Sequence, residues 1–223
     1  MILALFVIVF LSSECMGVND VWALKNTTSD LSVFATAGHL KQSWAKNQNT
    51  EIEGGFYQLK RTPEGFVLSA DLVDSYIYSE AKNSTDFFWD KGDLIELLIK
   101  KQSENQYYEF HVASSGVLFQ VRWPSFDIFM EFVRAPDKKI YIAPHLLQTN
   151  TTFSNSKNKK GWSVELRIPY EVLESNPKEA QEIAWRYVVC RNNIFKDKRV
   201  EYSAGSNFSK PFFHKLEEWS YFQ

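Results

Sequence analysis

The chain reads WDKGDLIELLI at residues 89–99 and GWSVELRIP at residues 161–169, and these two stretches decide the expected fold. Each passes from a turn or a glycine into an apolar run that carries a carboxylate. Short apolar runs bounded by turn residues are typical of β-strands. The sequence therefore predicts that both stretches enter strands.

Alternation of side chains along other segments extends this prediction. Apolar positions recur with a period of two in Phe66–Leu72, Tyr107–Val112, Val117–Trp123 and Trp162–Ile168. A period of two places successive side chains on opposite faces of a strand. Turn residues lie beside these runs, as in antiparallel hairpins, at Pro63–Gly65 and Ser114–Gly116. These features predict an all-β fold, a jelly-roll-like sandwich of two antiparallel sheets.

Few segments depart from this pattern. Pro169–Leu173 is expected to start a single helical turn, with proline at the first helical position, and Pro177–Glu182 is expected to form a second short helix. The polar stretch Thr149–Lys160 predicts a long surface loop between strands. We expect one domain over residues 18–223, because 44% hydrophobic content in a chain of this length can form one large core.

The N-terminal segment predicts export. Residues 1–11 are almost purely apolar, but a helix that crosses a bilayer needs about 20 apolar residues. We therefore expect a signal peptide at residues 1–17 and a protein without a membrane span that is secreted, periplasmic or held at the cell surface. Cys15 is either removed with the signal peptide or carries a lipid anchor. Cys190 is expected to be a small buried apolar residue.

Charge and motifs argue against several classes of function. The net charge of −2 favours no nucleic-acid partner. The sequence has no His-Glu-x-x-His motif, no Gly-x-Ser-x-Gly motif and no phosphate-binding glycine loop. Glu109 and His111 share one strand face, which we expect to be solvated and to hold a weak ion pair. Asp93 with Glu96, or Glu109 with Glu165, lies in regular strands rather than in the cleft of a glycoside hydrolase. We expect no enzyme activity.

Aromatic side chains indicate a binding function instead. A tryptophan beside a turn can offer an exposed ring to the C–H face of a sugar, while polar neighbours bind the sugar hydroxyls. Trp89 and Trp123 meet this condition, and Trp44 meets it more weakly. The alternative for Trp89 and Trp123 is a ring that caps one end of the sandwich. Trp162 and Trp185 lie on apolar strand faces and are expected in the core.

The order of these motifs resembles that of the family 9 carbohydrate-binding modules. These modules show a Tyr-x-Tyr strand, a Gly-Asp-x-x-Glu strand and a Tyr-rich strand with a glycine hairpin. A Gly-Trp-x-x-Glu-x-x-Ile-Pro strand, a Trp-Arg strand that ends in Arg-Asn, and a terminal aromatic strand with a His follow. The matching segments are Tyr76–Tyr78, Gly92–Glu96, Tyr107–Gly116, Gly161–Pro169, Trp185–Asn192 and Phe213–Phe222.

The resemblance implies a non-catalytic β-sandwich that clamps a sugar ring between two tryptophans and binds it through Glu, Arg and Asn side chains. It implies that Trp89 is one clamp. The second clamp is either replaced by Phe195 or absent. Together with the Trp123 platform, the ligand-binding candidates are Trp89, Glu96, Arg122, Trp123 and Asn192.

Cofactors and partners follow from the same resemblance. Family members often hold structural calcium, for which Asp71, Asp74 or Asp93 could serve. No other cofactor is expected. The expected partners are mono- and oligosaccharides, the ends of polysaccharides, and separately encoded glycan-degrading enzymes.

Two other functions remain open for the same fold. One is a structural or adhesive envelope protein that has no sugar site. The other is a haem-binding domain of the DOMON type, in which Met130 with His111 or His145 would be the axial ligands.

Overall fold

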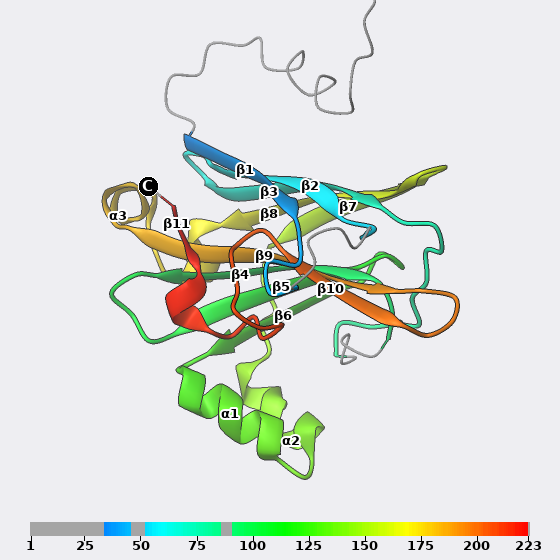
Figure 1. Ribbon diagram of the computed structural model, residues 1–223. Coiled ribbons are helices and arrows are strands. Elements are labelled where there is room, and N and C mark those ends of the chain that lie inside the picture. Colours follow the sequence, from blue (N-terminus) through cyan, green and yellow to red (C-terminus); the bar gives the residue numbers. More distant parts are fainter. Residues whose placement is uncertain (1–33, 46–51, 86–90, 223) are drawn as a thin grey trace, which may run out of the picture. The chain divides into compact units, whose positions relative to one another are not determined.

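The computed structural model describes residues 34–45, 52–85 and 91–222. The strands are β1 (Phe34–Leu40), β2 (Gly55–Arg61), β3 (Gly65–Val73), β4 (Leu94–Lys101), β5 (Tyr107–Ala113), β6 (Leu118–Trp123), β7 (Thr152–Asn158), β8 (Gly161–Pro169), β9 (Trp185–Ile194), β10 (Val200–Ala204) and β11 (Ser220–Phe222) (Figure 1). The helices are α1 (Phe126–Arg134), α2 (Lys138–Ile142) and α3 (Pro177–Glu182), with 3-10 turns η2 (Ala143–His145), η3 (Tyr170–Leu173) and η4 (Leu216–Glu218).

These strands form two antiparallel sheets. The five-stranded sheet has the order β1-β2-β3-β8-β7, and the six-stranded sheet has the order β10-β9-β4-β5-β6. The short strand β11 pairs with the first part of β9, and β10 pairs with its last part, so the two share one edge of that strand. The sequence-based prediction of a two-sheet antiparallel β-sandwich is confirmed.

The two sheets enclose an apolar core to which both contribute alternate side chains. Leu59, Leu68 and Leu166 come from the five-stranded sheet and pack with residues such as Leu97 and Phe110 from the six-stranded one. The two core tryptophans expected from the sequence are confirmed, because both rings are fully buried, at Trp162 and Trp185.

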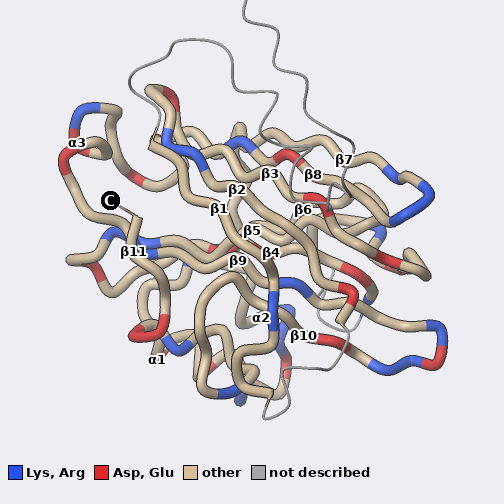
Figure 2. The backbone as a smooth tube through the Cα atoms, turned by 45° about the horizontal axis from the view of Figure 1, so that its top comes forward, with Lys and Arg blue, Asp and Glu red and all other residues tan. Residues whose placement is uncertain are grey.

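The outer faces of the two sheets differ. The outer face of the five-stranded sheet is polar and partly exposed, with paired residues such as Ser163 opposite Asp71 and an ion pair between Arg167 and Glu165. In the six-stranded sheet, β4 and β5 are buried at every position, so both of their faces are covered. Figure 2 shows acidic and basic residues interspersed along the strands and loops.

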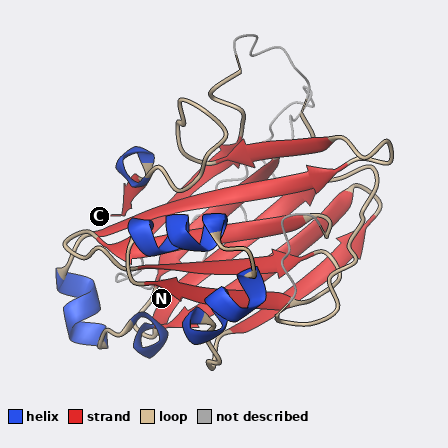
Figure 3. Ribbon diagram, turned by 90° about the horizontal axis from the view of Figure 1, so that it is seen from below, coloured by secondary structure: helices blue, strands red, loops and turns tan. Residues whose placement is uncertain are grey.

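The outer face of the six-stranded sheet carries a second apolar core. The side chains that pack on this face are Phe129 and Phe132 from α1, Ile142 from α2, and Phe208 and Trp219 from the segment that follows β10, which we call the C-terminal segment. Figure 3, seen from the side on which Figure 1 places α1 and α2, shows helices in front of the strands. The protein therefore has three layers here, two sheets and a cover, rather than a bare sandwich.

Glycines stand just before β4 and at the start of β8 because another segment of backbone approaches them too closely for a side chain. Gly92 and Gly161 have positive φ angles of 139° and 152°. A Cβ at Gly92 would collide with the carbonyl of Tyr78, and one at Gly161 with the carbonyl of Leu72. Since only glycine fits such positions, these turns fix where β4 and β8 begin.

Several local predictions can be compared with the structure. The expected helical turn and short helix are present as η3 and α3. The prediction of a loop at Thr149–Lys160 is wrong, because this stretch contains the edge strand β7. The strand is mostly polar, and its Phe153 packs against the core. The helices α1 and α2 were not expected from the sequence.

The N-terminal predictions stay untested. Residues 32–223 form one compact unit, and the predicted signal peptide at residues 1–17 lies outside the described residues, as does Cys15. Cys190 is a buried free cysteine, as expected. In the described part of the chain, no helix is long and apolar enough to cross a membrane.

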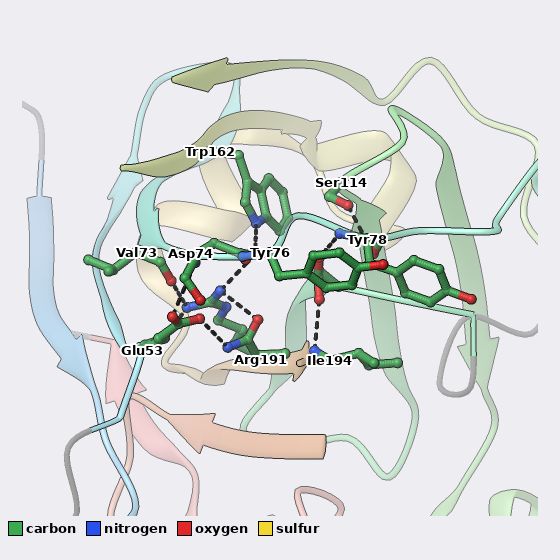
Figure 4. A network of polar contacts seen from close by, with 12 residues as sticks. Glu53, Val73, Asp74, Tyr76, Tyr78, Ser114, Trp162, Arg191 and Ile194 are labelled. Carbon is green, nitrogen blue, oxygen red and sulfur yellow. Dashed lines mark hydrogen bonds and ion pairs between the residues drawn. The ribbon is translucent and has the colours of Figure 1, made fainter. Parts of the chain in front are cut away.

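One end of the sandwich is closed by the buried guanidinium of Arg191. Its Nη1 donates to the backbone carbonyls of Glu53, Gly54 and Val73, at 2.7 Å for the last two (Figure 4). Its Nη2 donates to Asp74 Oδ2 at 3.1 Å. The Arg191 network therefore links β9 of one sheet to the ends of β2 and β3 of the other.

The same network satisfies its acidic members. Trp162 Nε1 donates to Asp74 Oδ2 at 3.2 Å, and the backbone N–H of Tyr76 donates to Asp74 Oδ1 at 2.9 Å. Asn193 accepts from Arg191 at 3.1 Å and donates to Glu53 at 3.0 Å. A buried charge that is paired and hydrogen-bonded in this way is expensive to disrupt from one side.

We expect Arg191→Met to lower the free energy of unfolding by about 3–5 kcal/mol, because Asp74 and three carbonyls would lose their buried donor. Arg167→Met is the matched control, since the side chain of Arg167 is 59% exposed. Its loss should cost less than about 1 kcal/mol. Urea unfolding followed by circular dichroism measures both, and equal losses would show that the Arg191 network does not hold the sheets together.

Candidate functional site

A pocket of about 530 Å³ lies between the outer face of the six-stranded sheet and its cover. The sheet supplies Glu96 from β4, Asn192 from β9 and Tyr202 from β10. The cover supplies aromatic side chains from α1 and from the C-terminal segment, which are Phe129, Phe132, Phe212, Phe213 and His214. We call this cavity the sheet-face pocket.

Strand register brings the two polar sheet residues together. Glu96 lies opposite Cys190 on the neighbouring strand, so Asn192, two positions further on, is its diagonal neighbour on the same face. Diagonal neighbours in an antiparallel pair are on the order of 7–8 Å apart, within reach of one small ligand. Both side chains lie at the base of the pocket, because Glu96 is 3% and Asn192 2% exposed.

These two side chains are poorly satisfied by the protein. In the part of the chain that the structure describes, Asn192 Oδ1 is buried and has no hydrogen-bond partner. The nearest titratable partner of Glu96 is His111, whose Nδ1 lies 3.9 Å from Glu96 Oε1, beyond hydrogen-bond distance. A buried acceptor without a donor costs about 1–3 kcal/mol. A ligand or an ordered water that supplies the missing donor would remove this cost.

Glu109 organises the buried polar side chains beside the pocket. Trp123 Nε1 donates to its Oε1 at 2.8 Å, and His111 Nε2 lies 3.1 Å from its Oε2. His214 Nδ1 lies 3.4 Å from Glu109 Oε1 and 3.0 Å from the hydroxyl of Tyr107. Phe129 stacks on the His214 ring with centroids 3.5 Å apart. This Glu109 cluster fixes the wall of the pocket that His214 forms.

The burial of this cluster corrects a prediction. Glu109 and His111 were expected on a solvated strand face, yet they are 0% and 1% exposed. Their face is covered because α1 and the C-terminal segment pack on it. Glu109 and Glu165 lie on the outer faces of different sheets, so they do not face one another.

Burial also shifts the protonation equilibria of these groups. It raises the pKa of Glu96 to about 7 and raises the pKa of Glu109. It lowers the pKa of His111 and brings that of His214 to about 4. Burial therefore disfavours the charged forms of all four groups, the two imidazolium cations as well as the two carboxylates.

The structure separates the five predicted ligand-binding residues. Glu96 and Asn192 line the sheet-face pocket. Trp123 is 0% exposed and donates its N–H to Glu109, so the expectation of an exposed stacking platform is wrong for this ring. Arg122 is its neighbour in sequence and points to the opposite side of β6, where it pairs with Glu174. Trp89 lies outside the described residues.

The two weaker aromatic candidates, Phe195 and Trp44, do not line the sheet-face pocket in the described structure. Phe195, considered as a second clamp, does not line the sheet-face pocket in the described structure, and the guanidinium of Arg199 lies 4.0 Å from its ring centroid. Trp44 packs on Phe213 with centroids 6.1 Å apart, behind the pocket wall.

The calcium candidates have separate protein partners. Asp71 accepts a hydrogen bond from Ser163, Asp74 belongs to the Arg191 network, and Asp93 accepts from the backbone N–H of Ile194. Among the described residues, no group of three or more His, Cys, Asp or Glu side chains could hold a metal ion. The prediction of structural calcium stays untested.

The three candidate haem ligands each contact a different part of the protein. His111 is engaged with Glu109, His145 packs on Trp123 with centroids 5.5 Å apart, and Met130 packs on the outer core from α1. None of the three lines the sheet-face pocket in the described structure.

Sequence reasoning missed the aromatic cover of the pocket. Phe126, Phe129 and Phe132 recur at helical spacing after Ser125, whose side chain caps α1 by accepting from the N–H of Ile128. A helix N-cap followed by this spacing was the available signal. The C-terminal Phe212–His214 segment has no such periodicity, and nothing local indicated which face it covers.

Comparisons with known proteins agree with the fold. The chain matches no family model and no curated protein by sequence. Among solved structures, it resembles a protein of Bacteroides uniformis that is provisionally assigned as carbohydrate-binding. The TM-score is 0.60 and the identity 11%, over 83% of this chain and 84% of the other.

A family 9 carbohydrate-binding module of Caldicellulosiruptor kristjanssonii, solved with cellotriose, matches with a TM-score of 0.46 and 12% identity, over 75% of this chain and 72% of the module. The likeness to the Bacteroides protein shows that the two chains share a fold. The sandwich implied by the sequence motifs is thus confirmed.

The raised pKa of Glu96 predicts how stability depends on pH. The folded protein holds the Glu96 proton up to about pH 7, whereas the ordinary value is 4.5, so stability is lost as pH rises from 4.5 to 7. Glu96→Gln removes this loss. Relative to wild type, the free energy of unfolding of Glu96→Gln should therefore rise between pH 5 and pH 8 by about 3 kcal/mol.

The titratable or charged groups that face Glu96 or line the pocket with it are His111 and Glu109 on β5, Cys190 on β9, Tyr202 on β10, and His214 and Lys138 from the cover. All of them remain in the variant. Urea unfolding at several pH values measures the difference, with Glu165→Gln on the outer face of the five-stranded sheet as control. Parallel pH profiles for wild type and Glu96→Gln would show that Glu96 ionises normally.

Proposed function

We propose that this protein binds carbohydrate in the sheet-face pocket and carries out no catalysis there. The observation that carries the proposal is the combination of aromatic walls with two buried polar side chains at the base, Asn192, whose Oδ1 has no donor among the described residues, and Glu96, whose Oε1 lies 3.9 Å from His111 Nδ1. Sugars present apolar C–H faces and hydroxyl donors, and such a pocket offers a partner for each.

The pieces of the pocket take different roles in this proposal. Phe129, Phe132 and Phe212 provide rings for the apolar faces of the sugar. Glu96 and Asn192 accept hydrogen bonds from hydroxyl groups. Arg122, which the resemblance implied as a contact, is not part of the proposed site because it lies on the other face of its strand. Trp89 remains a candidate clamp.

The fold likeness supports the proposal in a general way, since the Bacteroides uniformis protein is provisionally assigned as carbohydrate-binding. Export of the protein and a role beside separately encoded glycan-degrading enzymes belong to the same proposal. They rest on the apolar N-terminal segment and on the motif resemblance.

Calorimetric titration of the protein with a panel of mono- and oligosaccharides tests the proposal. Saturable binding should weaken by about tenfold or more in Phe212→Ala, which removes one wall, and Trp89→Ala tests the predicted clamp. Tyr221→Ala is the matched control, because this aromatic side chain is 55% exposed and does not line the pocket. Absence of binding to every sugar would favour a structural or adhesive protein without a sugar site.

Asn192 should show a trade-off between stability and binding. We expect Asn192→Leu to raise the free energy of unfolding by about 1 kcal/mol, since it removes a buried acceptor without a donor. The same change should abolish sugar binding, because the hydroxyl loses its acceptor. Thermal unfolding and calorimetry measure the two effects.

Asn193→Leu is the control for this experiment. Asn193 is the next residue of β9, points to the other face and has both ends of its amide hydrogen-bonded. We expect it to lose about 1–3 kcal/mol of stability. If Asn192→Leu is destabilised as much as Asn193→Leu, the Asn192 amide is satisfied inside the protein and is no ligand acceptor.

A further inference from the structure

The charge at the base of the sheet-face pocket is unbalanced. Glu96 and Asn192 Oδ1 both accept hydrogen bonds, and Glu109 lies beside them in the same buried cluster. His111 and His214 are the nearest groups that could carry positive charge, and burial disfavours the charged form of each by lowering its pKa. In the described structure, no Arg side chain lines the pocket. The base of the pocket therefore offers the Asn192 acceptor and the acidic side chain of Glu96, and no Lys or Arg among the described residues lies there to pair with the Glu96 carboxylate when it ionises.

Lys138 is the basic residue of the pocket lining, and it lies at the rim. Its Nζ donates to the carbonyls of Phe132 at 3.2 Å and Val133 at 2.6 Å, at the C-terminal end of α1. Its Nζ also lies 5.1 Å from the centroid of the Phe132 ring. Lys138 is exposed, whereas Glu96 and Asn192 are buried. Since charges interact more strongly away from water, the buried base decides the preferred ligand charge.

We propose that the sheet-face pocket selects an amino sugar that carries a free, protonated amine, held between Glu96 and Asn192 Oδ1 at the base of the pocket. The inference rests on the proposed function and names its ligand class. An ammonium group has three donors and no acceptor, which complements the unpaired Asn192 Oδ1 and the carboxyl group of Glu96. Its charge also meets the buried carboxylate that the protein leaves without a cation.

The walls of the pocket suit the same ligand. Phe212 is a partly exposed ring of the pocket wall, and a cation near an aromatic face is attracted by the ring quadrupole. A neutral sugar would make the same ring and hydroxyl contacts as the amino sugar, but it would lack the ion pair with Glu96. An N-acetylated amine loses its charge and adds an acceptor that faces Glu96. An acidic sugar places like charges together at the base.

Calorimetry at pH 7 with glucosamine, glucose, N-acetylglucosamine and glucuronate tests the inference on the unmodified protein. We expect glucosamine to bind at least tenfold more tightly than glucose. Added salt should narrow that ratio, because the extra contact is a charge pair. The comparison among sugars needs no variant and so does not depend on a variant that folds.

Glu96→Gln keeps the size of the side chain and removes its charge. It should bring the affinities for glucosamine and glucose to within about twofold of each other, through a loss of glucosamine binding. Glu165→Gln, on the outer face of the other sheet, should leave the wild-type ratio unchanged.

The outcomes separate this inference from the proposed function. Glucose or N-acetylglucosamine binding as tightly as glucosamine would overturn the amine preference and leave carbohydrate binding in place. Tightest binding of glucuronate would overturn it too, and would assign ligand selection to Lys138. No binding of any of these or of the wider sugar panel would overturn both proposals.

Discussion

The structure depends on the burial of the six-stranded sheet on both faces. β4 and β5 have no exposed position. Their side chains alternate between the core that lies between the sheets and the core that lies beneath the cover. Leu97 packs between the sheets, whereas Glu96 and Leu98 face the cover. A sheet of this kind needs apolar material on each side, and the protein uses the second sheet on one side and α1, α2 and the C-terminal segment on the other.

This arrangement explains why the cover encloses a pocket rather than a continuous core. The outer face of the sheet carries carboxylate and amide side chains among its apolar residues. One of these carboxylates, Glu109, contacts Trp123 of the neighbouring strand and His214 of the cover. β9 shows the contrast within three residues. Arg191 and Asn193 point between the sheets and are extensively hydrogen-bonded, while Asn192 points outward and leaves its oxygen without a partner in the described structure. Among these three residues, the unsatisfied acceptor is the one that faces the pocket.

Much of the sandwich could be predicted from the sequence because strand alternation is a local signal. The hairpin turn at Ser114–Gly116, the burial of Trp162 and Trp185, and the role of Gly161 at the start of β8 all follow from residue types within a few positions. Glu96 and Asn192 were selected through the motif resemblance, and the structure brings both to one cavity. Whether they bind a ligand stays a prediction.

The remainder depended on contacts between distant segments. Alternation assigned Trp123 to one face of β6 but gave no information about what covers that face, so a buried ring resembled an exposed one. The same gap made Glu109 and His111 look solvated. The pocket walls come from α1 and from residues 212–214, far apart in the chain, and only the tertiary structure shows that they meet.

The measurement that tests the central claim most directly is a titration of the ¹⁵N-labelled protein with glucosamine and with neutral oligosaccharides, followed by amide chemical shifts. Binding in the sheet-face pocket predicts saturable shifts for Glu96, Asn192 and residues 212–214, with little change at Ser69 and Ser163 on the outer face of the five-stranded sheet. Shifts confined to that polar face, or no shifts at saturating sugar, would contradict a carbohydrate site beneath the cover.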